Sequence, residues 1–590
     1  MPNKPQSMLG RFLVWRLRHI PQRQFILILS VVVGLISGLV AVTLKNSTHL
    51  IQQFVNSEWF NDIYNPFYFA FPVIGILITV GIKRFFKNPV GEGIPSTLYA
   101  ISRRNGLLRP YKMFASVITS MFTVGFGGSV GLEGPTVSTG SAIGSNLARV
   151  MHLNYKSRTL LISCATAAAI SSIFNAPIAA IIFTIEIFSL DLTLASLIPL
   201  LLASATGAMT SLFFQGSGHL FHFKVVDQMD LSQLPFYVFL GIGSALLSVY
   251  FNKVYLGLEE WFSKFKGWLK FIGGGFLLGL LIFLIPPLYG EGYETINALL
   301  SGNYMAVLEE SFLLEYSSSE TMILALLLGL GLTKVFAASL TISSGGVGGI
   351  FAPSLYVGAS FGFFFSKILN SLGLTALPET NFALAGMAGL MAGVLHAPLT
   401  AIFMIAEITG GYSMFLPLML TSAASFLVTR SIMPHSIYTV QLAKRGDLLT
   451  HDKDHAILTL MKLEQVIESD FIKVNQEMKL ADLVSVFKQS TRNIFPVVNE
   501  NEELVGILTL ENFKQLLFDK TLHEKVTVGQ LMIAPVAVID KSENMDSVLA
   551  KFKTSGAWNL PVVTNGVYKG FVSKSKLFSA YRRKLKEVSD

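Results

Sequence analysis

The sequence is poor in cysteine and in charged residues. Cys164 is the only cysteine among 590 residues, so an intrachain disulfide is excluded, and its Ala-rich apolar surroundings indicate a packing residue. Charged residues make up 14% of the chain and hydrophobic residues 52%, a balance that excludes an ordinary soluble protein. The short alternating strands of a membrane β-barrel are also lacking. The composition therefore predicts an all-α polytopic membrane domain.

Two further absences bear on function. The sequence has no Cys/His metal cluster and no nucleophile-elbow motif, which argues against a membrane enzyme. The net charge of +8 is what an excess of Lys and Arg in cytoplasmic loops produces, so it predicts no nucleic-acid partner. What is abundant is glycine, with 49 residues, and the chain has 22 prolines; many of both lie inside apolar segments. This pattern indicates broken or tightly packed membrane helices in contact with lipid.

The order of segments predicts a cytoplasmic N-terminus and a long membrane domain. Residues 1–23 carry four arginines ahead of the apolar run 25–44, which is long enough to span a bilayer and lacks a cleavage site. We expect the membrane domain at 24–445, with halves at about 24–215 and 233–445, in the plasma (inner) membrane. The more polar stretch Tyr289 to Ser319 is interpreted as an aqueous loop.

The membrane domain contains an internal repeat. Four residues of the first half recur at a constant offset of 218, namely Gly131, Pro135, Gly140 and Gly144 as Gly349, Pro353, Gly358 and Gly362. A second block, Asn175-Ala176-Pro177 with Glu186, recurs as His396-Ala397-Pro398 with Glu407 at an offset of 221. Two related halves, each with a Gly-rich break before a helix, are what transporters use to build a midplane site.

After residue 445 the composition changes to short strands and amphipathic helices, with both termini of the chain expected in the cytoplasm. We predict a linker at 446–465 and two related units at 466–523 and 524–590. The segments Phe495 to Val498 and Gly506 to Thr509 recur as Leu560 to Val563 and Gly570 to Ser573. Each unit is small for independent stability, so the two are expected to pack as a pair.

One carboxylate stands out in the membrane domain. Glu133 lies between glycines and ahead of Pro135, in a region that is otherwise apolar. Ionisable groups at membrane depth are costly and are therefore usually functional. Flanking glycines expose backbone N–H groups, and proline suits the first turn of a helix. The stretch thus predicts an anion site at a helix N-terminus with an acid placed in it.

The chain resembles the CLC family of chloride channels and proton/chloride antiporters. The motifs that carry the resemblance are Gly91-Glu92-Gly93-Ile94-Pro95, Gly131-Leu132-Glu133-Gly134-Pro135, Phe174-Asn175-Ala176-Pro177, Gly348-Gly349-Ile350-Phe351-Ala352-Pro353 and Ser436-Ile437-Tyr438. The C-terminal repeat resembles a pair of CBS domains, which are small α+β modules. The resemblance implies an inverted repeat with re-entrant helices, a homodimer, and chloride as the transported ion.

The resemblance also implies roles for particular residues. Backbone N–H groups near Gly134, Ile350 and Phe351 would line the anion path, and the Tyr438 hydroxyl would coordinate the central ion from the cytoplasmic side. The alternative for Tyr438 is an interface-belt residue. Glu133 would act as a gate that occupies the anion site when ionised and leaves it when protonated. The alternative for Glu133 is a fixed helix cap.

Three departures from the family pattern concern the membrane domain. The usual basic residue before the gate is Leu132, so positive charge is lost at the outer mouth. Glu92 stands where a serine commonly donates to the anion; either it is protonated or it points away. Antiporters often carry an intracellular-side glutamate one residue after Glu186, where this chain has Ile187. The proton path candidates are therefore Glu133, Glu92 and Glu186, or water.

The C-terminal pair also departs from its family pattern. Nucleotide-binding copies tend to place an aspartate three residues after the Ser or Thr of a turn, and here those positions are Asn512 and Lys576. Thr509, Asn512 and Ser573 are the candidate contacts for an adenine nucleotide, which these departures disfavour. No cofactor is otherwise expected.

The sequence leaves the mode of transport open. Glu133 and Tyr438 fit either proton-coupled antiport or a gated channel, with antiport favoured because a protonatable gate already provides half of a proton path. A fluoride-selective member is less favoured, because that subgroup usually alters the tyrosine. The alternative from another class is a secondary transporter of another anion or an organic substrate.

Overall fold

Apolar helices make up most of the described part of the first 445 residues. The structure is a computed structural model that describes residues 8–55, 67–86, 93–189, 193–216, 221, 231–265, 267–309, 320–444, 458 and 461–589. The chain divides into two compact units, Met1–Arg445 and Gly446–Asp590, which we call the membrane unit and the C-terminal unit.

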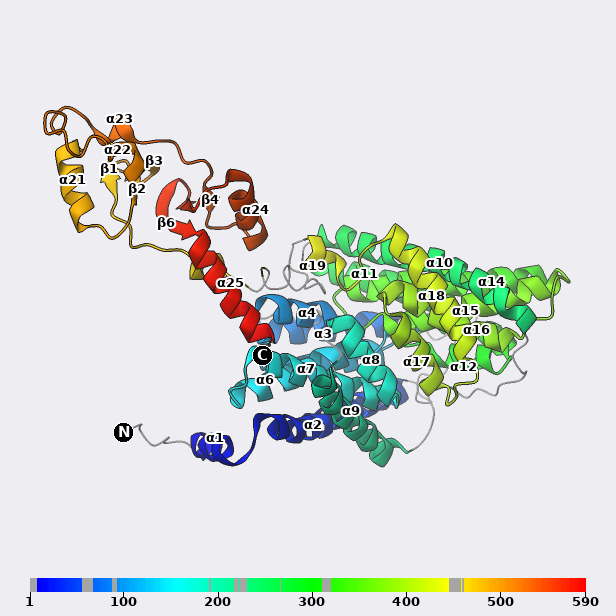
Figure 1. Cartoon of the computed structure of the whole chain (residues 1–590). Helices are drawn as coiled ribbons and strands as arrows, with labels where there is room; N and C mark the ends of the chain where they lie inside the picture. The colour runs from blue at the N-terminus through cyan, green and yellow to red at the C-terminus, as the bar shows by residue number, and fades with distance from the viewer. Residues whose placement is uncertain are drawn as a thin grey trace. The chain divides into compact units, whose positions relative to one another are not determined.

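The helices of the first half of the membrane unit include both long spans and short pieces (Figure 1). They are α1 (Met8–His19), α2 (Gln22–Val55), α3 (Phe67–Phe86), α4 (Gly93–Arg103), α5 (Lys112–Gly125), α6 (Glu133–Val150), α7 (Tyr155–Phe174), α8 (Pro177–Phe188) and α9 (Leu194–Gln215). The short pieces confirm the broken helices that glycine and proline predicted.

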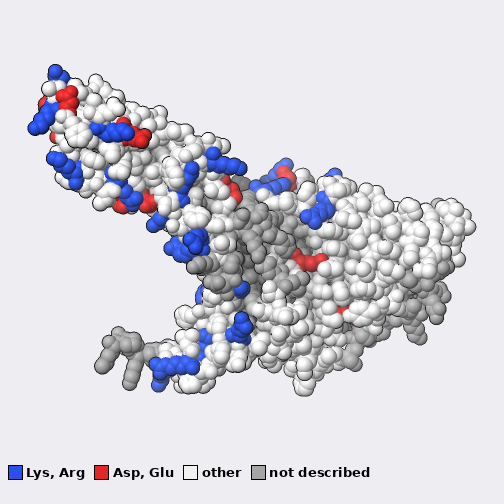
Figure 2. Space-filling model, in the orientation of Figure 1, with Lys and Arg blue, Asp and Glu red and all other residues white. Residues whose placement is uncertain are grey.

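The second half also combines long and short helices. Its helices are α10 (Leu234–Ser263), α11 (Trp268–Leu284), α12 (Tyr293–Leu300), α13 (Tyr304–Glu309), α14 (Glu320–Ser343), α15 (Phe351–Ser371), α16 (Glu379–Leu395), α17 (Pro398–Ile408), α18 (Phe415–Ile432) and α19 (Val440–Lys444). In the described ranges, seven helical spans are long and apolar enough to cross a membrane. The visible surface over the second half is almost without charged side chains (Figure 2).

The repeat that the sequence predicted is visible in the backbone. Asn175 ends α7 and His396 ends α16, both in the left-handed conformation with φ of 53° and 58°. Pro177 and Pro398 then begin α8 and α17, where their missing N–H costs nothing. The two blocks therefore mark equivalent helix breaks, and each turns the chain from a long buried helix into a short one.

The glycines shared by the two halves allow close helix packing. A Cβ on Gly144 of α6 would collide with the backbone of α7 at Leu161, and a Cβ on Gly362 of α15 would collide with the backbone of α16 at Phe382. Helix pairs in membranes gain their contact from such small residues. The repeated glycines thus let α6 pack closely on α7 and α15 on α16. α6 and α15 are the two helices whose starts face each other.

One expectation about the loops was wrong. The stretch Tyr289 to Ser319 was interpreted as an aqueous loop, but Tyr293–Leu300 forms α12, whose Ile296, Leu299 and Leu300 are buried. The polar residues of this stretch concealed an apolar face at helical spacing. Residues 310–319 lie outside the described ranges.

The C-terminal unit is built from two similar three-stranded sheets, as the duplication predicted. The first contains β1 (Val474–Asn475), β2 (Ile494–Val498) and β3 (Leu504–Thr509), with helices α21 (Leu480–Gln489), α22 (Leu510–Phe513) and α23 (Val528–Leu531). The second contains β4 (Ile539–Asp540), β5 (Asn559–Thr564) and β6 (Val567–Ser573), with α24 (Met545–Ser555) and α25 (Lys574–Ser589).

In each sheet the first strand pairs in parallel with the second, and the second pairs antiparallel with the third. The two copies are joined by backbone hydrogen bonds, including Leu504 N–H to the Gly566 carbonyl at 3.0 Å. A shared apolar cluster contains Ile507 of the first copy and Phe571 of the second. The expected packing of the copies as a pair is confirmed.

Candidate functional site

The first turns of α6 and α15 are tied together by a two-residue bridge. Gly131 donates its N–H to the Gly349 carbonyl at 2.9 Å, and Gly349 donates to the Gly131 carbonyl at 2.8 Å. Gly131 and Gly349 are equivalent residues of the two halves, so the bridge joins the two halves at matching positions. Two helix N-termini, each with unpaired N–H groups and a positive dipole end, thereby converge on one place.

The side chain of Glu133 occupies this place. The residue is 3% exposed, and its Oε1 accepts a hydrogen bond of 2.5 Å from the Phe351 N–H. Oε2 is buried and has no hydrogen-bond partner among the described residues. The carboxylate therefore sits where the first turn of α15 would bind an anion.

A cavity of about 540 Å³ opens beside these helix starts, and we call it the vestibule. The residues of α4, α6 and α15 and their preceding loops that line it are Gly93, Ile94, Pro95, Ser96, Gly134, Gly348, Gly349 and Ile350. Its charged lining residues are Lys83, Arg104, Arg109, Lys112 and Glu259. Four cations against one acid favour anions in the cavity.

Tyr438, which follows α18, also lines the vestibule and is only 8% exposed. Glu133 lies close enough for its charge to act on the Tyr438 hydroxyl. Gly134, Ile350 and Tyr438 therefore share one cavity, whereas Phe351 is engaged by Glu133 behind it. The role of Tyr438 in coordinating an anion stays a prediction.

Glu186, a candidate for the proton path, caps a helix of the opposite half. Its carboxylate accepts from the Leu399 N–H at 3.0 Å and from the Thr400 N–H at 2.7 Å, both in the first turn of α17. Glu407 does the same for α8, accepting from the Ile178 and Ala179 N–H groups at 3.1 and 2.8 Å. The two glutamates thus exchange caps across the repeat. Sequence reasoning had matched them by position without foreseeing this contact.

The chain departs from the family pattern at Glu92, Leu132 and Ile187. Glu92, proposed as a substitute proton acceptor, lies outside the described residues. Leu132 is 4% exposed and contributes no charge, and Ile187 is buried in α8. Two acids that sequence reasoning missed lie near the path: Glu259 in the vestibule, and Glu291, whose Oε1 accepts from the Leu132 N–H at 3.3 Å. A lone glutamate between two glycines, at 290–292, was the available signal for Glu291.

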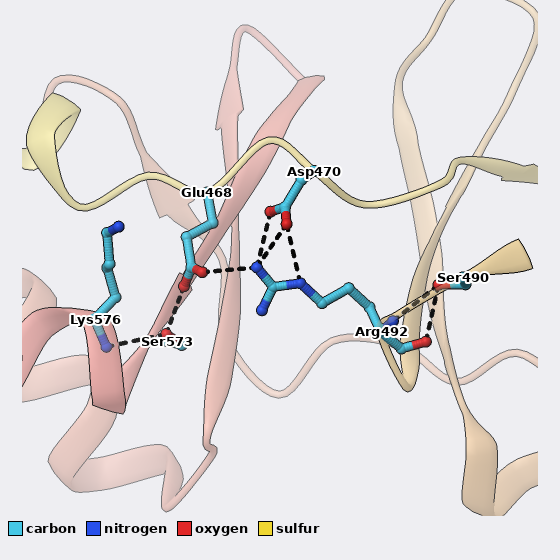
Figure 3. A network of polar contacts seen from close by, with 6 residues as sticks. All are labelled: Glu468, Asp470, Ser490, Arg492, Ser573 and Lys576. Carbon is cyan, nitrogen blue, oxygen red and sulfur yellow. Dashed lines mark hydrogen bonds and ion pairs between the residues drawn. The ribbon is translucent and has the colours of Figure 1, made fainter.

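In the C-terminal unit the candidate nucleotide contacts are engaged in intrachain hydrogen bonds. Asn512 Oδ1 accepts from the Thr509 hydroxyl at 2.5 Å and from the Thr509 N–H at 2.9 Å, as a helix cap. Ser573 donates its hydroxyl to Glu468 Oε1 at 2.6 Å and accepts from the Lys576 N–H at 3.2 Å (Figure 3).

Glu468 belongs to a charged network between the two copies. Its Oε2 accepts from Arg492 Nη2 at 3.0 Å, and Arg492 also donates to both carboxylate oxygens of Asp470, at 2.9 Å and 2.7 Å (Figure 3). Hydrogen bonding from Arg492 lowers the pKa of the Asp470 carboxyl from its ordinary value. The Ser573 hydroxyl is thus directed at a protein carboxylate.

Comparison with known proteins agrees with this geometry. Among curated relatives, an H(+)/Cl(-) exchange transporter ClcA from Vibrio cholerae serotype O1 is 29% identical over 441 residues, covering 70% of this chain and 88% of that protein. A ClcA exchange transporter from Salmonella paratyphi A is 28% identical over 439 residues, covering 71% and 88%.

Two solved structures share the fold. A slow cyanobacterial Cl−/H+ antiporter matches with a TM-score of 0.60 at 22% identity, covering 72% of this chain and 98% of that chain. A eukaryotic CLC transporter matches with a TM-score of 0.62 at 17% identity, covering 97% and 99%.

The family models match both units of the chain. The model of the CBS domain matches residues 463–519 and 528–583, and the model described as voltage gated chloride channel matches residues 74–430. Because the second match spans more than half of the sequence and includes both helix starts at Glu133 and Phe351, the chain belongs to the voltage-gated chloride channel (CLC) family.

Proposed function

We propose that this protein exchanges chloride for protons across a membrane, with Glu133 as the protonatable gate. The observation that carries the proposal is the hydrogen bond from the Phe351 N–H to Glu133 Oε1, which puts a carboxylate in an anion site. The names of the Vibrio and Salmonella relatives, both exchange transporters for protons and chloride, support the same activity.

The cycle follows from competition for one set of N–H donors. Ionised Glu133 holds the Phe351 N–H and excludes chloride. Protonation removes the charge that made this contact favourable, so the side chain leaves and a chloride from the vestibule takes its place near Gly134, Ile350 and Phe351. Tyr438 would coordinate that ion from the vestibule side. Backbone dipoles hold the ion without a full cation, which allows it to leave again.

The decisive experiment records chloride efflux and external pH together in liposomes that contain the purified protein. Antiport moves protons against chloride in a fixed ratio, whereas a channel moves chloride alone. Glu133→Gln, which imitates the protonated gate, is expected to keep chloride flux, abolish proton flux and remove the pH dependence. The absence of chloride flux in the wild type would overturn the proposal.

A gated chloride channel is the second candidate, because Ile187 cannot carry a proton. In that case the same recording shows chloride efflux without a pH change. A transporter of an organic anion is the further alternative, and replacing chloride by an organic anion in the efflux assay tests it. The relatives support a transporter and offer no support for an enzyme.

For the proton route on the vestibule side we propose Glu92, which by sequence precedes the first turn of α4. Glu186 is a weaker candidate, because both of its oxygens already accept hydrogen bonds from α17. Glu92→Gln is expected to abolish proton flux and spare chloride flux, while Glu186→Gln leaves the coupling ratio intact. Unchanged coupling in Glu92→Gln would exclude this route.

For the C-terminal unit we propose a role that does not depend on adenine-nucleotide binding at Thr509, Asn512 and Ser573. The support is that Ser573 donates to Glu468 and that Asn512 Oδ1 accepts from the Thr509 hydroxyl, so these side chains are engaged within the chain. Calorimetric titration of the full-length protein with ATP is expected to give no saturable heat. A saturable signal that Ser573→Ala weakens would overturn this.

We further propose that the protein is a homodimer in the plasma (inner) membrane, with both termini in the cytoplasm. Family membership supports the dimer, and the arginines of residues 1–23 support the orientation. Size-exclusion chromatography with light scattering tests the first point, and protease accessibility of both ends in oriented vesicles tests the second.

A further inference from the structure

A cluster of charged groups, of which Lys334 is fully buried and Lys45 and Glu291 are partly buried, lies beside the start of the gate helix. Its centre is Glu291, in the short loop between α11 and α12, which accepts from the Leu132 N–H at 3.3 Å. Lys45 of α2 and Lys334 of α14 attract its charge, and Tyr293 of α12 forms a hydrogen bond with it. Helices α2, α12 and α14 thus each bring a charged or polar group to Glu291. Glu291 in turn contacts Leu132, the residue before Glu133.

Lys334 is the most deeply placed of these groups. It is 0% exposed, and its ammonium donates to the carbonyls of Gly290 at 2.8 Å and Leu288 at 3.2 Å. It also lies 4.9 Å from the centre of the Tyr356 ring, whose face attracts a cation. A lysine is almost never fully buried unless it is paired in this way, so the cluster is a built feature of the fold.

The loop that carries Glu291 is fixed from both sides. Gly290 donates its N–H to the Gly127 carbonyl at 3.2 Å, and the Ser129 hydroxyl donates to the Leu288 carbonyl at 2.7 Å. Gly292 has φ of 86°, and a Cβ there would collide with the Tyr356 ring. The carboxyl of Glu291 is therefore held at the loop that leads into Glu133.

The titratable groups that face Glu291 are Lys45, Lys334, Tyr293 and Glu133, from four different helices. Those that face Glu133 are Glu291, Tyr293 and Tyr438. Of the two sets, none but Tyr438 is among the described residues that line the vestibule. Leu132 contacts Glu291 while Gly134 lines the vestibule, so the gate lies between the cavity and this charged cluster.

We propose that Glu291 is a positioning residue that sets the pH at which the Glu133 gate opens. Its negative charge repels the ionised form of Glu133 and favours the protonated form, while its hydrogen bond to Leu132 holds the backbone of the gate. Lys45 and Lys334 oppose this repulsion. Lys45 and Lys334 also supply positive charge near position 132, where the family usually has a basic residue and this chain has Leu132. This inference rests on the proposed function of Glu133.

The test is the pH profile of chloride efflux from liposomes. Glu291→Gln removes the repulsion and leaves both lysines uncompensated, so the pH of half-maximal flux is expected to fall by about one unit, the order that Coulomb's law gives for neighbouring charges inside a protein. Lys45→Met removes an opposing cation at a half-buried site and is expected to shift the profile the other way. Glu291→Asp keeps the charge and should keep the wild-type profile.

Glu294→Gln is the matched control, because Glu294 is an exposed acid in the first turn of α12. It is expected to leave the profile unchanged. A purely structural role for Glu291 lowers flux at every pH without moving the profile, and that result, or an unmoved profile in Lys45→Met, overturns the inference. The proposed function fails separately, when Glu133→Gln leaves pH dependence and proton flux unaltered. If Glu291→Gln does not fold, Lys45→Met alone decides.

Discussion

The Phe351 N–H and the Glu133 carboxylate meet across the two halves of the membrane unit, at 2.5 Å and with equivalent places in the repeat. Glu133 is the first residue of α6 and Phe351 the first residue of α15, so one half supplies the acid and the other supplies the donor. The two halves differ at this pair of positions, with an acid in one half and Phe351 in the other. In the proposed mechanism this acid gates an anion site that is built from the backbone of both halves.

The glycine before the gate limits where the carboxylate can rest. A Cβ on Gly131 would collide with Glu133 Oε2 and with the methyl group of Ala352, so Gly131→Ala crowds the closed gate. Overpacking of this kind costs about 1–3 kcal/mol, so we expect chloride efflux at pH 7.5 to rise roughly fivefold or more. Gly329→Ala, in open space on α14, is the control and should leave efflux unchanged. Unaltered efflux in Gly131→Ala would show that the gate rests elsewhere.

The Tyr438 hydroxyl is expected to contribute directly to chloride affinity. A hydrogen bond to a charged group contributes about 1.5–3 kcal/mol, so Tyr438→Phe should weaken chloride binding by roughly tenfold or more in calorimetric titrations of the purified protein. Tyr412, which is 49% exposed and does not line the vestibule, provides the matched Tyr412→Phe control. Equal affinities in the two variants would indicate that Tyr438 only packs.

The exchanged caps of Glu186 and Glu407 are expected to stabilise the fold without acting on protons. Removing a side-chain helix cap costs about 1 kcal/mol, so Glu186→Ala and Glu407→Ala should each lower the thermal unfolding midpoint of the protein in detergent. The proton-to-chloride ratio should stay at the wild-type value in both. A lost proton flux in Glu186→Ala, together with normal flux in Glu407→Ala, would instead assign Glu186 to the proton path.

Much of this site could be predicted because its signals are local. Gly131 to Pro135 and Gly348 to Pro353 each combine flexible glycines with a proline suited to a first turn, and the structure begins α6 and α15 there. The constant offset of 218 predicted equivalent places for them. That Gly131 and Gly349 pair with each other required only that the two halves face one another.

The remaining features depend on long-range contacts that no local pattern encodes. Glu186 reaches the first turn of α17 more than two hundred residues away, and a glutamate near the end of an apolar helix looks the same with or without that partner. Glu291 lies in a loop at the start of the polar stretch 289–319, which was interpreted as aqueous, so its contact with Leu132 was not expected. Its Gly-Glu-Gly setting also occurs at 91–93, ahead of α4, and this second occurrence of the motif was the available signal.

The ion pair between Asp470 and Arg492 predicts an acid-sensitive step in the C-terminal unit. Arg492 lowers the pKa of Asp470, so the pair stabilises the folded state above the unfolded pKa of about 4 and is lost as the pH falls through the lower, folded value. Urea denaturation of residues 446–590, followed by circular dichroism, should therefore show stability that declines below about pH 4. Asp470→Asn should make that decline shallower while Asp482→Asn, an exposed acid on α21, should not. An identical decline in all three proteins would mean that the pair contributes nothing to folding, as many exposed ion pairs do not.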